Sequence, residues 1–232
     1  AAITEKLVPI MAIFYICGSL IAIGMNAENI LPALKSVFVG AFTPQAVMGG
    51  AIGISIKEAI RFGVARGLFS NEAGMGSTPH AHATAEVKNP CDQGIIAMMG
   101  VFIDTFIVLT MTALVILSTG ALNSGLTGAE LAQTAYNAGF GSFGNIFIAV
   151  CMLFFAFTTI LGWDYYSERC LEYMFAGNQK VVKAYRWLYI LAVFIGPFMT
   201  VSAVWTIADI FNGLMAIPNL IALVALSGVV VK

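Results

Sequence analysis

The sequence predicts an all-α, polytopic membrane protein. Hydrophobic residues make up 59% of the chain and charged residues 10%, whereas a soluble domain is usually about 45–50% apolar and about 25% charged. A chain of 232 residues cannot bury so much apolar surface in its own core, so the excess is expected to face lipid. Several apolar runs reach about twenty residues, the length of a membrane-spanning helix and about twice that of a barrel strand.

Five apolar runs are predicted as regular spans, and together they contain a single charged residue, Asp104. In chain order they are Leu7–Met25, Gly94–Thr119, Phe143–Trp163, Trp187–Ile207 and Ile210–Val231. A sixth, irregular span is predicted between Gln45 and about Lys88, so about six transmembrane helices are expected. Asn29–Phe42 is too short and too polar to cross and is predicted as an interfacial helix. Leu122–Phe140 is predicted as a glycine-rich, amphipathic loop.

Basic residues predict the orientation, because lysine and arginine are enriched in cytoplasmic loops. One loop carries Arg169, Lys180, Lys183 and Arg186, while residues 120–142 carry no basic residue. With the first loop in the cytoplasm, Lys6, Lys88 and Lys232 also lie there and Lys35 lies outside, seven residues against one. Three basic residues in the irregular span stay unassigned: Lys57, Arg61 and Arg66. The prediction is a cell (plasma or inner) membrane protein with both ends of the chain in the cytoplasm.

Charge and cysteine content exclude several other classes. The formal net charge is −1, so no basic face is available to bind nucleic acid. The four cysteines are widely spaced and show neither zinc-ligand spacing nor a disulfide framework. No phosphate-binding loop of the GxxxxGK[ST] type is present in the sequence, so nucleotide-driven transport is unsupported.

The irregular span contains a stretch that breaks the helical pattern. Residues 63–93 read GVARGLFSNEAGMGSTPHAHATAEVKNPCDQ, and Ser70–Gly76 combines two glycines with serine and asparagine, which favour local non-helical hydrogen bonds. Such a break at membrane depth is tolerated only when it is buried in protein or lines a cavity, where its free main-chain groups can bind a carboxylate and a cation. The alternative is a cytoplasmic loop that follows a short span ending near Ser55, and composition leaves both open.

The same stretch carries a resemblance to a known family. GVARGLFSNEAGMGSTPHAHATAEVKNPCDQG, followed by VFIDTFIVLTMTALVIL, closely resembles the alanine or glycine:cation symporters, as do FFAFTTILGWDYYSER and WTIADIFNGLMAIPNLIAL. The resemblance covers nearly the whole chain and implies a LeuT-like fold of two five-helix inverted repeats. Residues 1–26 would end the first repeat, 27–44 would form an external interfacial segment, and 45–232 would form the second repeat. The chain would then be a single transmembrane domain fragment whose N-terminal half is missing.

The resemblance also implies a substrate site for a small neutral amino acid. Residues at the break are expected to contribute to it: Phe69, Ser70, Asn71 and Gly74. Phe69 would close the cavity, although a core-facing or lipid-facing ring is the alternative. Thr159 and Trp163 are four residues apart and share a helical face. The hydroxyl would orient the substrate and the ring would limit its volume; alternatively, the threonine bonds back to its own helix and Trp163 sits at the membrane interface.

Sodium is the expected coupling ion, and no other cofactor is implied. The resemblance places Thr158 and Thr159 in a helix where adjacent hydroxyls coordinate sodium, a hard cation that prefers oxygen ligands. Asp104 is a third candidate ligand, because a lone carboxylate inside a span needs a partner. The alternative is a structural ion pair between Asp104 and Arg61 or Arg66. In the last span, Asp209, Asn212 and Pro218-Asn219 predict a kink with internally bonded amides, or a part in gating.

The leading function is therefore sodium-driven uptake of alanine, glycine or a similar amino acid by alternating access, with no enzymatic chemistry. A cation channel lined by Glu72, Asp104 and Asp209, or a membrane scaffold, is the alternative. An intramembrane enzyme would need convergent ligands or a nucleophile–base pair, and His80 and His82, two residues apart, point to different helix faces. Substrate choice between alanine and glycine, and proton in place of sodium coupling, stay open.

Thr159→Val tests the proposed sodium and substrate role of this helix. Valine keeps the branched shape but removes the hydroxyl oxygen, so sodium-dependent amino-acid uptake is expected to weaken. Uptake is measured with labelled alanine as a function of sodium concentration. Unchanged transport would reject the role.

Overall fold

The computed structural model describes residues 2–42 and 56–230. Over these residues every regular element is helical and no β-strand is present, which confirms the all-α class. Residues 43–55, where the interfacial segment was predicted to end and the irregular span to begin, lie outside the described residues. So do Ala1, Val231 and Lys232, at the ends of the predicted topology.

Five candidate membrane spans lie within the described part of the chain, and they make it a multi-pass membrane protein. They are Thr4–Met25, Pro90–Ser118, Phe143–Met174, Gln179–Phe198 and Val201–Val229. The helices that form them are α1 (Ala2–Met25), α5 (Pro90–Phe102), η3 (Ile103–Leu109), α6 (Thr110–Ser118), α8 (Phe143–Met174), α9 (Gln179–Ile195) and α10 (Val201–Val230). The first two predicted spans match these candidate spans to within four residues at each end, whereas the third, predicted to end at Trp163, continues to Met174.

The last two predicted spans were divided at the wrong place. The predicted span Trp187–Ile207 is interrupted by the short helix η5 (Gly196–Phe198), after which Met199 is extended at φ −86° and ψ 154°. Pro197 has no N–H for the helical ladder, and its ring crowds the preceding turn, so a helix ends readily here. Helix α9 therefore ends at Ile195, and α10 runs through Ile207 as one helix. At its other end, α9 begins at Gln179, eight residues before the predicted start of the span at Trp187.

Six shorter elements complete the described fold. They are η1 (Ala27–Asn29), α2 (Ile30–Phe42), α3 (Ile56–Ser70), α4 (Thr78–His82), η4 (Ala121–Ser124) and α7 (Gly128–Phe140). Helix α2 matches the helix predicted for Asn29–Phe42. The loop predicted over Leu122–Phe140 was wrong for most of its length, because α7 is helical. Its amphipathic pattern gains stability by burying Ala135, Tyr136 and Gly139, since packing rather than propensity supplies most helix stability.

The chain divides into two compact units. The first comprises residues 1–62 and 98–160, and the second comprises residues 63–97 and 161–232. Helices α3, α5 and α8 each contribute residues to both units.

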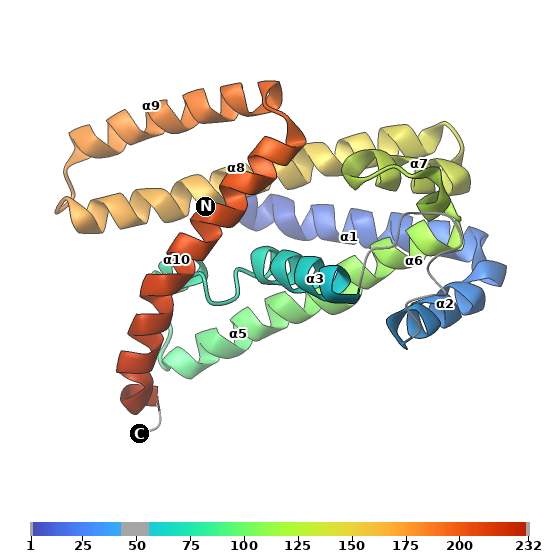
Figure 1. Cartoon of the computed structure of the whole chain (residues 1–232). Helices are drawn as coiled ribbons and strands as arrows, with labels where there is room; N and C mark the ends of the chain where they lie inside the picture. The colour runs from blue at the N-terminus through green and yellow to red at the C-terminus, as the bar shows by residue number, and fades with distance from the viewer. Residues whose placement is uncertain (1, 43–55, 231–232) are drawn as a thin grey trace. The chain divides into compact units, whose positions relative to one another are not determined.

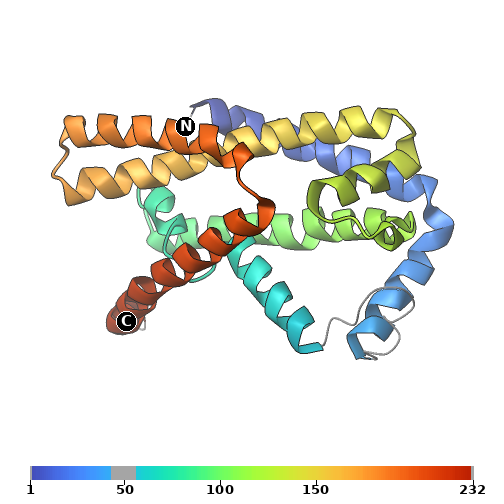
Figure 2. The ribbon, with the colours of Figure 1, turned by 45° about the horizontal axis from the view of Figure 1, so that its top comes forward.

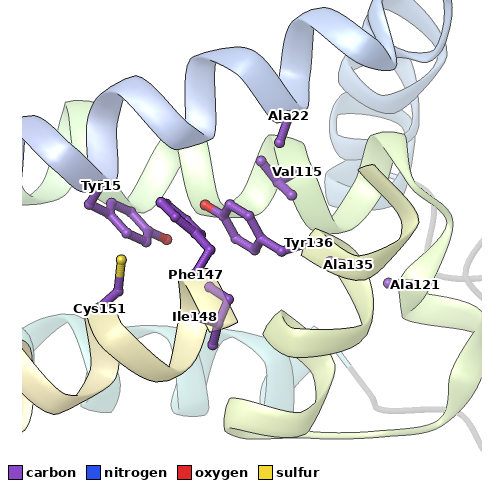
Figure 3. Packing of buried hydrophobic residues seen from close by; sticks show 9 residues of the cluster. All are labelled: Tyr15, Ala22, Val115, Ala121, Ala135, Tyr136, Phe147, Ile148 and Cys151. Atoms are coloured by element: carbon purple, nitrogen blue, oxygen red, sulfur yellow. The ribbon is translucent and has the colours of Figure 1, made fainter. Parts of the chain in front are cut away.

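An aromatic cluster forms the core of the first unit (Figure 3). Tyr15 of α1, Tyr136 of α7 and Phe147 of α8 meet there, with the Phe147 ring 6.4 Å from Tyr15 and 5.3 Å from Tyr136. Buried aliphatic and small residues surround these rings: Ala22, Val115, Ala121, Ala135, Ile148 and Cys151. Helix α6 packs against α1, α2 and α7, so the cluster joins helices from distant parts of the sequence (Figures 1 and 2).

The two tyrosines of this core have hydrogen-bond partners. The hydroxyls of Tyr136 and Ser19 are 2.5 Å apart, and those of Tyr15 and Thr112 are 2.6 Å apart. Ser19 also donates to the main-chain oxygen of Tyr15 at 2.8 Å. Burial raises the pKa of Tyr136, which keeps this phenol protonated. Because buried hydroxyls need partners, these bonds fix α7 and α6 against α1 in one arrangement.

A helical hairpin dominates the second unit. The C-terminal part of α8 and helix α9 run side by side in opposite directions (Figures 1 and 2). The turn between them uses the left-handed residues Ala176 (φ 49°) and Gly177 (φ 77°), and the Asn178 side chain accepts from the Lys180 N–H to cap α9. Arg186 of α9 forms an ion pair with Glu168 of α8 across the hairpin. All four basic residues that predicted the cytoplasmic loop lie within helices, Arg169 in α8 and Lys180, Lys183 and Arg186 in α9.

Gly144→Ala is expected to destabilise the first unit. An added Cβ at Gly144 would lie 2.5 Å from the Tyr136 carbonyl carbon and oxygen, and backbone cannot move aside as a side chain can. We expect a loss of about 1–3 kcal/mol of unfolding free energy, typical of overpacking. Thermal unfolding of the chain in detergent measures the effect.

Gly24→Ala is the matched control, since no described atom outside its immediate neighbourhood lies within 4 Å of the added Cβ. Alanine favours helix over glycine by about 0.5–1 kcal/mol, so this variant is expected to unfold at an equal or higher temperature. Equal melting of the two variants would contradict the close packing of α7 on α8.

Candidate functional site

The irregular backbone predicted over Ser70–Gly76 is present in the second unit, and its position at membrane depth stays a prediction. Helix α3 ends at Ser70, and regular helix does not resume until α4 begins at Thr78. Three residues between them adopt left-handed backbone: Glu72 at φ 50°, Gly74 at φ 76° and Gly76 at φ 80°. Glycine enters this region freely because it has no Cβ, whereas Glu72 does so at an energetic cost. The sequence signal of paired glycines therefore located the backbone change correctly.

Local hydrogen bonds shape the start of the break. The main-chain N–H and the side-chain Nδ2 of Asn71 both donate to the Gly67 oxygen, each at 3.1 Å. The Ala73 N–H donates to the Leu68 oxygen at 3.0 Å, a longer loop than the α-helical one. The helix therefore ends in a widened turn, and its end carbonyls attract positive charge.

The Glu72 carboxylate stabilises the other end of the break. One of its oxygens accepts from the Ser77 Oγ at 2.8 Å and from the Thr78 Oγ1 at 2.7 Å. Ser77 is 2% exposed, so its hydroxyl needs such a partner. These bonds offset the unfavourable backbone of Glu72 and fix the chain where α4 begins. The sequence marked Glu72 as a costly charged residue of the break and as a candidate channel-lining residue, but it did not predict these hydrogen bonds.

The histidines of α4 contact neighbouring side chains. His80 Nδ1 lies 3.0 Å from the Ser77 oxygen, and its Nε2 lies 3.0 Å from the Cys170 sulfur on α8. His82 Nδ1 lies 2.6 Å from the Gln93 amide nitrogen. Among the described residues, no group of three or more histidine, cysteine or acidic side chains could hold a metal ion. These contacts tie α4 to the helices around it.

Phe69 lies half-buried against α10. Its ring makes an edge contact with Trp205, with ring centroids 5.7 Å apart. Trp163 on α8 is also half-buried and makes an edge contact with Tyr166 at 5.7 Å. Ser70 and Gly74 are exposed in the chain, and Asn71 is half-buried. The substrate role of these residues stays a prediction.

The candidate sodium ligands of α8 differ from each other in burial. Thr158 is 9% exposed, and its hydroxyl lies 2.9 Å from the Phe154 oxygen and 3.1 Å from the Phe155 oxygen of its own helix. Thr159 is exposed. The back-bonding considered for threonines is therefore present at Thr158. A hydroxyl that donates to a carbonyl still has oxygen lone pairs for a cation, so this bond is compatible with sodium binding.

Asp104 lies in a π-helix. Residues Ile103–Leu109 form this wide segment in the middle of the span that joins α5 to α6, and Asp104 is half-buried in its first turn. Such segments are rare and often mark functional positions. Nothing in the composition of the span predicted it. The carboxylate and the unusual backbone together keep Asp104 a candidate ligand.

The predicted site residues are divided between the two units. Asp104, Thr158 and Thr159 belong to the first, and the remaining candidates belong to the second: Phe69, Ser70, Asn71, Gly74 and Trp163. In the second unit the break makes its contacts with α10, where the structure adds residues that the site prediction had omitted. These are Arg66, Trp205, Asp209 and Asn219. An arginine in the otherwise largely apolar end of α3 and an aspartate within the apolar helix α10 were the available signal for the charged pair.

Comparison with known proteins decides the family. The family model described as "Sodium:alanine symporter family" matches residues 1–232. The chain belongs to the sodium:alanine symporter family. The resemblance noted from the sequence motifs is thereby confirmed, and the family is one of transporters and not of enzymes.

Relatives in this family cover nearly the whole chain. A protein named "Uncharacterized transporter" from Haemophilus influenzae is 48% identical over 100% of the chain and 51% of its own length. The "Sodium/alanine symporter AgcS" of Methanococcus maripaludis is 43% identical over 99% of the chain and 50% of its own length. The "Amino-acid carrier protein AlsT" of Bacillus subtilis is 39% identical over 100% and 48%, respectively. The chain thus spans about half the length of the curated relatives it matches.

Alanine substitutions at three glycines test the geometry of the break in this family member. Gly76→Ala is expected to be the most destabilising, because it combines a φ of 80° with a Cβ 2.9 Å from the Asn219 Cγ. Gly74→Ala shares the left-handed backbone but meets no described atom within 4 Å, so it should lose only the conformational term of about 1–2 kcal/mol. Thermal unfolding in detergent gives the order.

Gly67→Ala is the control, because Gly67 lies within α3 and its added Cβ also meets no described atom within 4 Å. This variant should be neutral or stabilising. If Gly74→Ala and Gly67→Ala melt alike, the left-handed turn at residue 74 is not a feature of the folded chain.

Proposed function

We propose that this chain forms part of a sodium-coupled symporter that takes up small neutral amino acids, such as alanine or glycine, by alternating access. The observation that carries the proposal is the break between α3 and α4, where three left-handed residues interrupt the helix. Family membership supports the same conclusion, and so does the name of the Methanococcus relative, a sodium/alanine symporter.

The chemistry of the break suits a zwitterionic amino acid. The carbonyl end of α3 carries partial negative charge and would attract an ammonium group or a cation. The main-chain dipoles of such a break can be directed at the carboxylate of a substrate. Ser70, Asn71 and Gly74 would supply main-chain groups, and Phe69 would cover the bound amino acid. Two aromatic walls, Phe69 and Trp163, would limit the size of the accepted side chain.

Sodium would be held by hydroxyl and carboxylate oxygens. Thr158 and Thr159 offer hydroxyls, and Asp104 offers a carboxylate in the π-helical segment. Sodium bound at these oxygens would neutralise the Asp104 carboxylate, whose charge is expensive in a membrane interior. This is a physical reason why entry of the ion and entry of the substrate would be coupled. No further cofactor is needed.

The proposed architecture extends the described helices to six spans of a LeuT-like fold. Residues 1–26 would end one repeat, 27–44 would lie at the external interface, and 45–232 would form the inverted repeat with its broken helix. Both ends of the chain would then face the cytoplasm. A partner half would complete the transporter, since the chain matches about half the length of its relatives.

A chimeric transporter tests the proposal. The segment of the Methanococcus symporter that matches this chain is replaced by residues 1–232, and uptake of labelled alanine is measured in cells that lack alanine transport. The expected result is saturable uptake that depends on a sodium gradient, with glycine and glutamine as competitors that define the substrate range. A second Bacillus subtilis relative, named "Probable sodium/glutamine symporter GlnT", makes glutamine an informative comparison.

The chimera also provides the assay for Thr159→Val. Thr206→Val on α10 is the matched control, because it removes a span hydroxyl that bonds back to the Ser202 oxygen at 2.9 Å. Surface quantification confirms that each variant reaches the membrane. A chimera that reaches the membrane but shows no sodium-dependent uptake, while the parent symporter does, would refute the proposal.

A further inference from the structure

Helix α10 contacts the chain at two positions around the break. The first is an ion pair before it, where the Arg66 guanidinium of α3 meets Asp209 of α10. Its Nη1 donates to Oδ1 at 2.8 Å and its Nη2 donates to Oδ2 at 3.3 Å. Two parallel bonds fix orientation as well as distance, which a single contact does not. Both residues have mostly apolar neighbours in the sequence, and an unpaired charge in an apolar environment would be expensive.

The ring of Trp205 completes this first contact. The guanidinium carbon of Arg66 lies 3.8 Å from the centroid of the Trp205 ring, a cation–π geometry. Trp205 and Asp209 are four residues apart, so one face of α10 presents both groups to Arg66. Phe69, immediately before the break, packs on the same ring at 5.7 Å. One turn of α10 thereby holds the last two turns of α3.

The second contact lies in the break itself. The Asn219 Nδ2 donates to the Gly74 main-chain oxygen at 3.0 Å. Gly76 approaches the same side chain so closely that a Cβ there would lie 2.9 Å from the Asn219 Cγ. The kink with internally bonded amides that the sequence predicted is therefore wrong for Asn219, whose amide bonds to another segment. Asn219 follows Asp209 by ten positions, a distance of about 15 Å along α10.

We infer that Asp209 and Asn219 are positioning residues that hold the broken segment in its binding geometry through α10. The inference rests on the proposed function, because Gly74 and Phe69 are among the groups assigned to the substrate. Gly74 keeps a left-handed φ of 76° while its carbonyl is held by Asn219. A shift of α10 against α3 would change the direction of that carbonyl and release the Phe69 ring. The geometry of the site therefore depends on the position of α10.

Cysteine labelling tests the inference without requiring transport. Ala73, exposed within the break, is replaced by cysteine in a chain whose native cysteines are serine, and the rate of maleimide labelling is measured in membranes. Asn219→Ala and Asp209→Asn should each raise that rate. Loss of one hydrogen bond should shift local opening about fivefold, equivalent to about 1 kcal/mol.

Two controls separate a local effect from a general one. Asn212→Ala removes an amide from the same helix, for which no contact with the break is described, and should leave the Ala73→Cys rate unchanged. A second chain keeps only Cys151, which is 1% exposed in the first unit and reports loss of folding. Its slow labelling should persist in all three variants. Equal Ala73→Cys rates, or a parallel rise at Cys151, would overturn the inference.

Uptake by the chimera then separates this inference from the proposed function. Asn219→Ala should raise the alanine KM about fivefold with little change in the maximal rate, since the substrate groups remain but are held less firmly. Faster labelling without any uptake by the parent chimera would support the positioning role and refute the function. Sodium-driven uptake by the chimera, with the KM and the labelling rate unchanged by Asn219→Ala, would support the function and refute the positioning role.

Discussion

The satisfaction of main-chain polar groups in a break between helices is the constraint on which the candidate site depends. In an apolar environment each unpaired N–H or C=O is expensive, so an interrupted helix persists only where other groups replace the lost bonds. Asn71 supplies an amide to the end of α3, Glu72 supplies a carboxylate to the start of α4, and Asn219 supplies an amide from another helix. Asn71 and Asn219 thus bond main-chain oxygens of the interrupted helix, whereas Glu72 bonds the side-chain hydroxyls of Ser77 and Thr78.

The first unit satisfies its buried groups in a different way. Its hydroxyls pair with one another across helices, Ser19 with Tyr136 and Tyr15 with Thr112, inside an aromatic cluster. This gives α1, α6, α7 and α8 a fixed mutual arrangement. In the second unit, α10 contains no fully buried residue in its apolar window, and its polar contacts with α3 and the break therefore matter more to its position.

The membrane spans, the irregular backbone at residues 70–76 and the family could be predicted from local sequence patterns. Long apolar runs gave the spans, because lipid selects for helix length and apolarity alone. The glycine pair and Asn71 gave the break, because few residues tolerate left-handed backbone or compete with the helix for its bonds. The motifs around Thr158 and Trp163 gave the family. The division between the last two helices was wrong because Gly196 and Pro197 were counted as part of an apolar run instead of as a helix end.

Tertiary partners could not be deduced in the same way. Asp209 and Asn219 stood out as polar residues in an apolar helix, but their partners Arg66 and Gly74 lie more than a hundred residues away in sequence. Helix α7 was predicted as a loop because its stability comes from burying Tyr136, which is visible only once α1 and α8 surround it. Such contacts depend on packing between segments, about which the local pattern of a single sequence is silent.

The π-helical segment at Ile103–Leu109 also changes the direction in which the side chains of the following helix, α6, point around the helix axis. A π-turn accommodates an additional residue relative to an α-turn, so the helix after it is rotated by about 100° from where unbroken α-helix would place it. Thr112 reaches the Tyr15 hydroxyl with this offset included. Side chains before and after the segment therefore do not share the faces that a continuous 3.6-residue period would assign them. A one-residue deletion there would realign the span as regular helix and turn Thr112 away from α1.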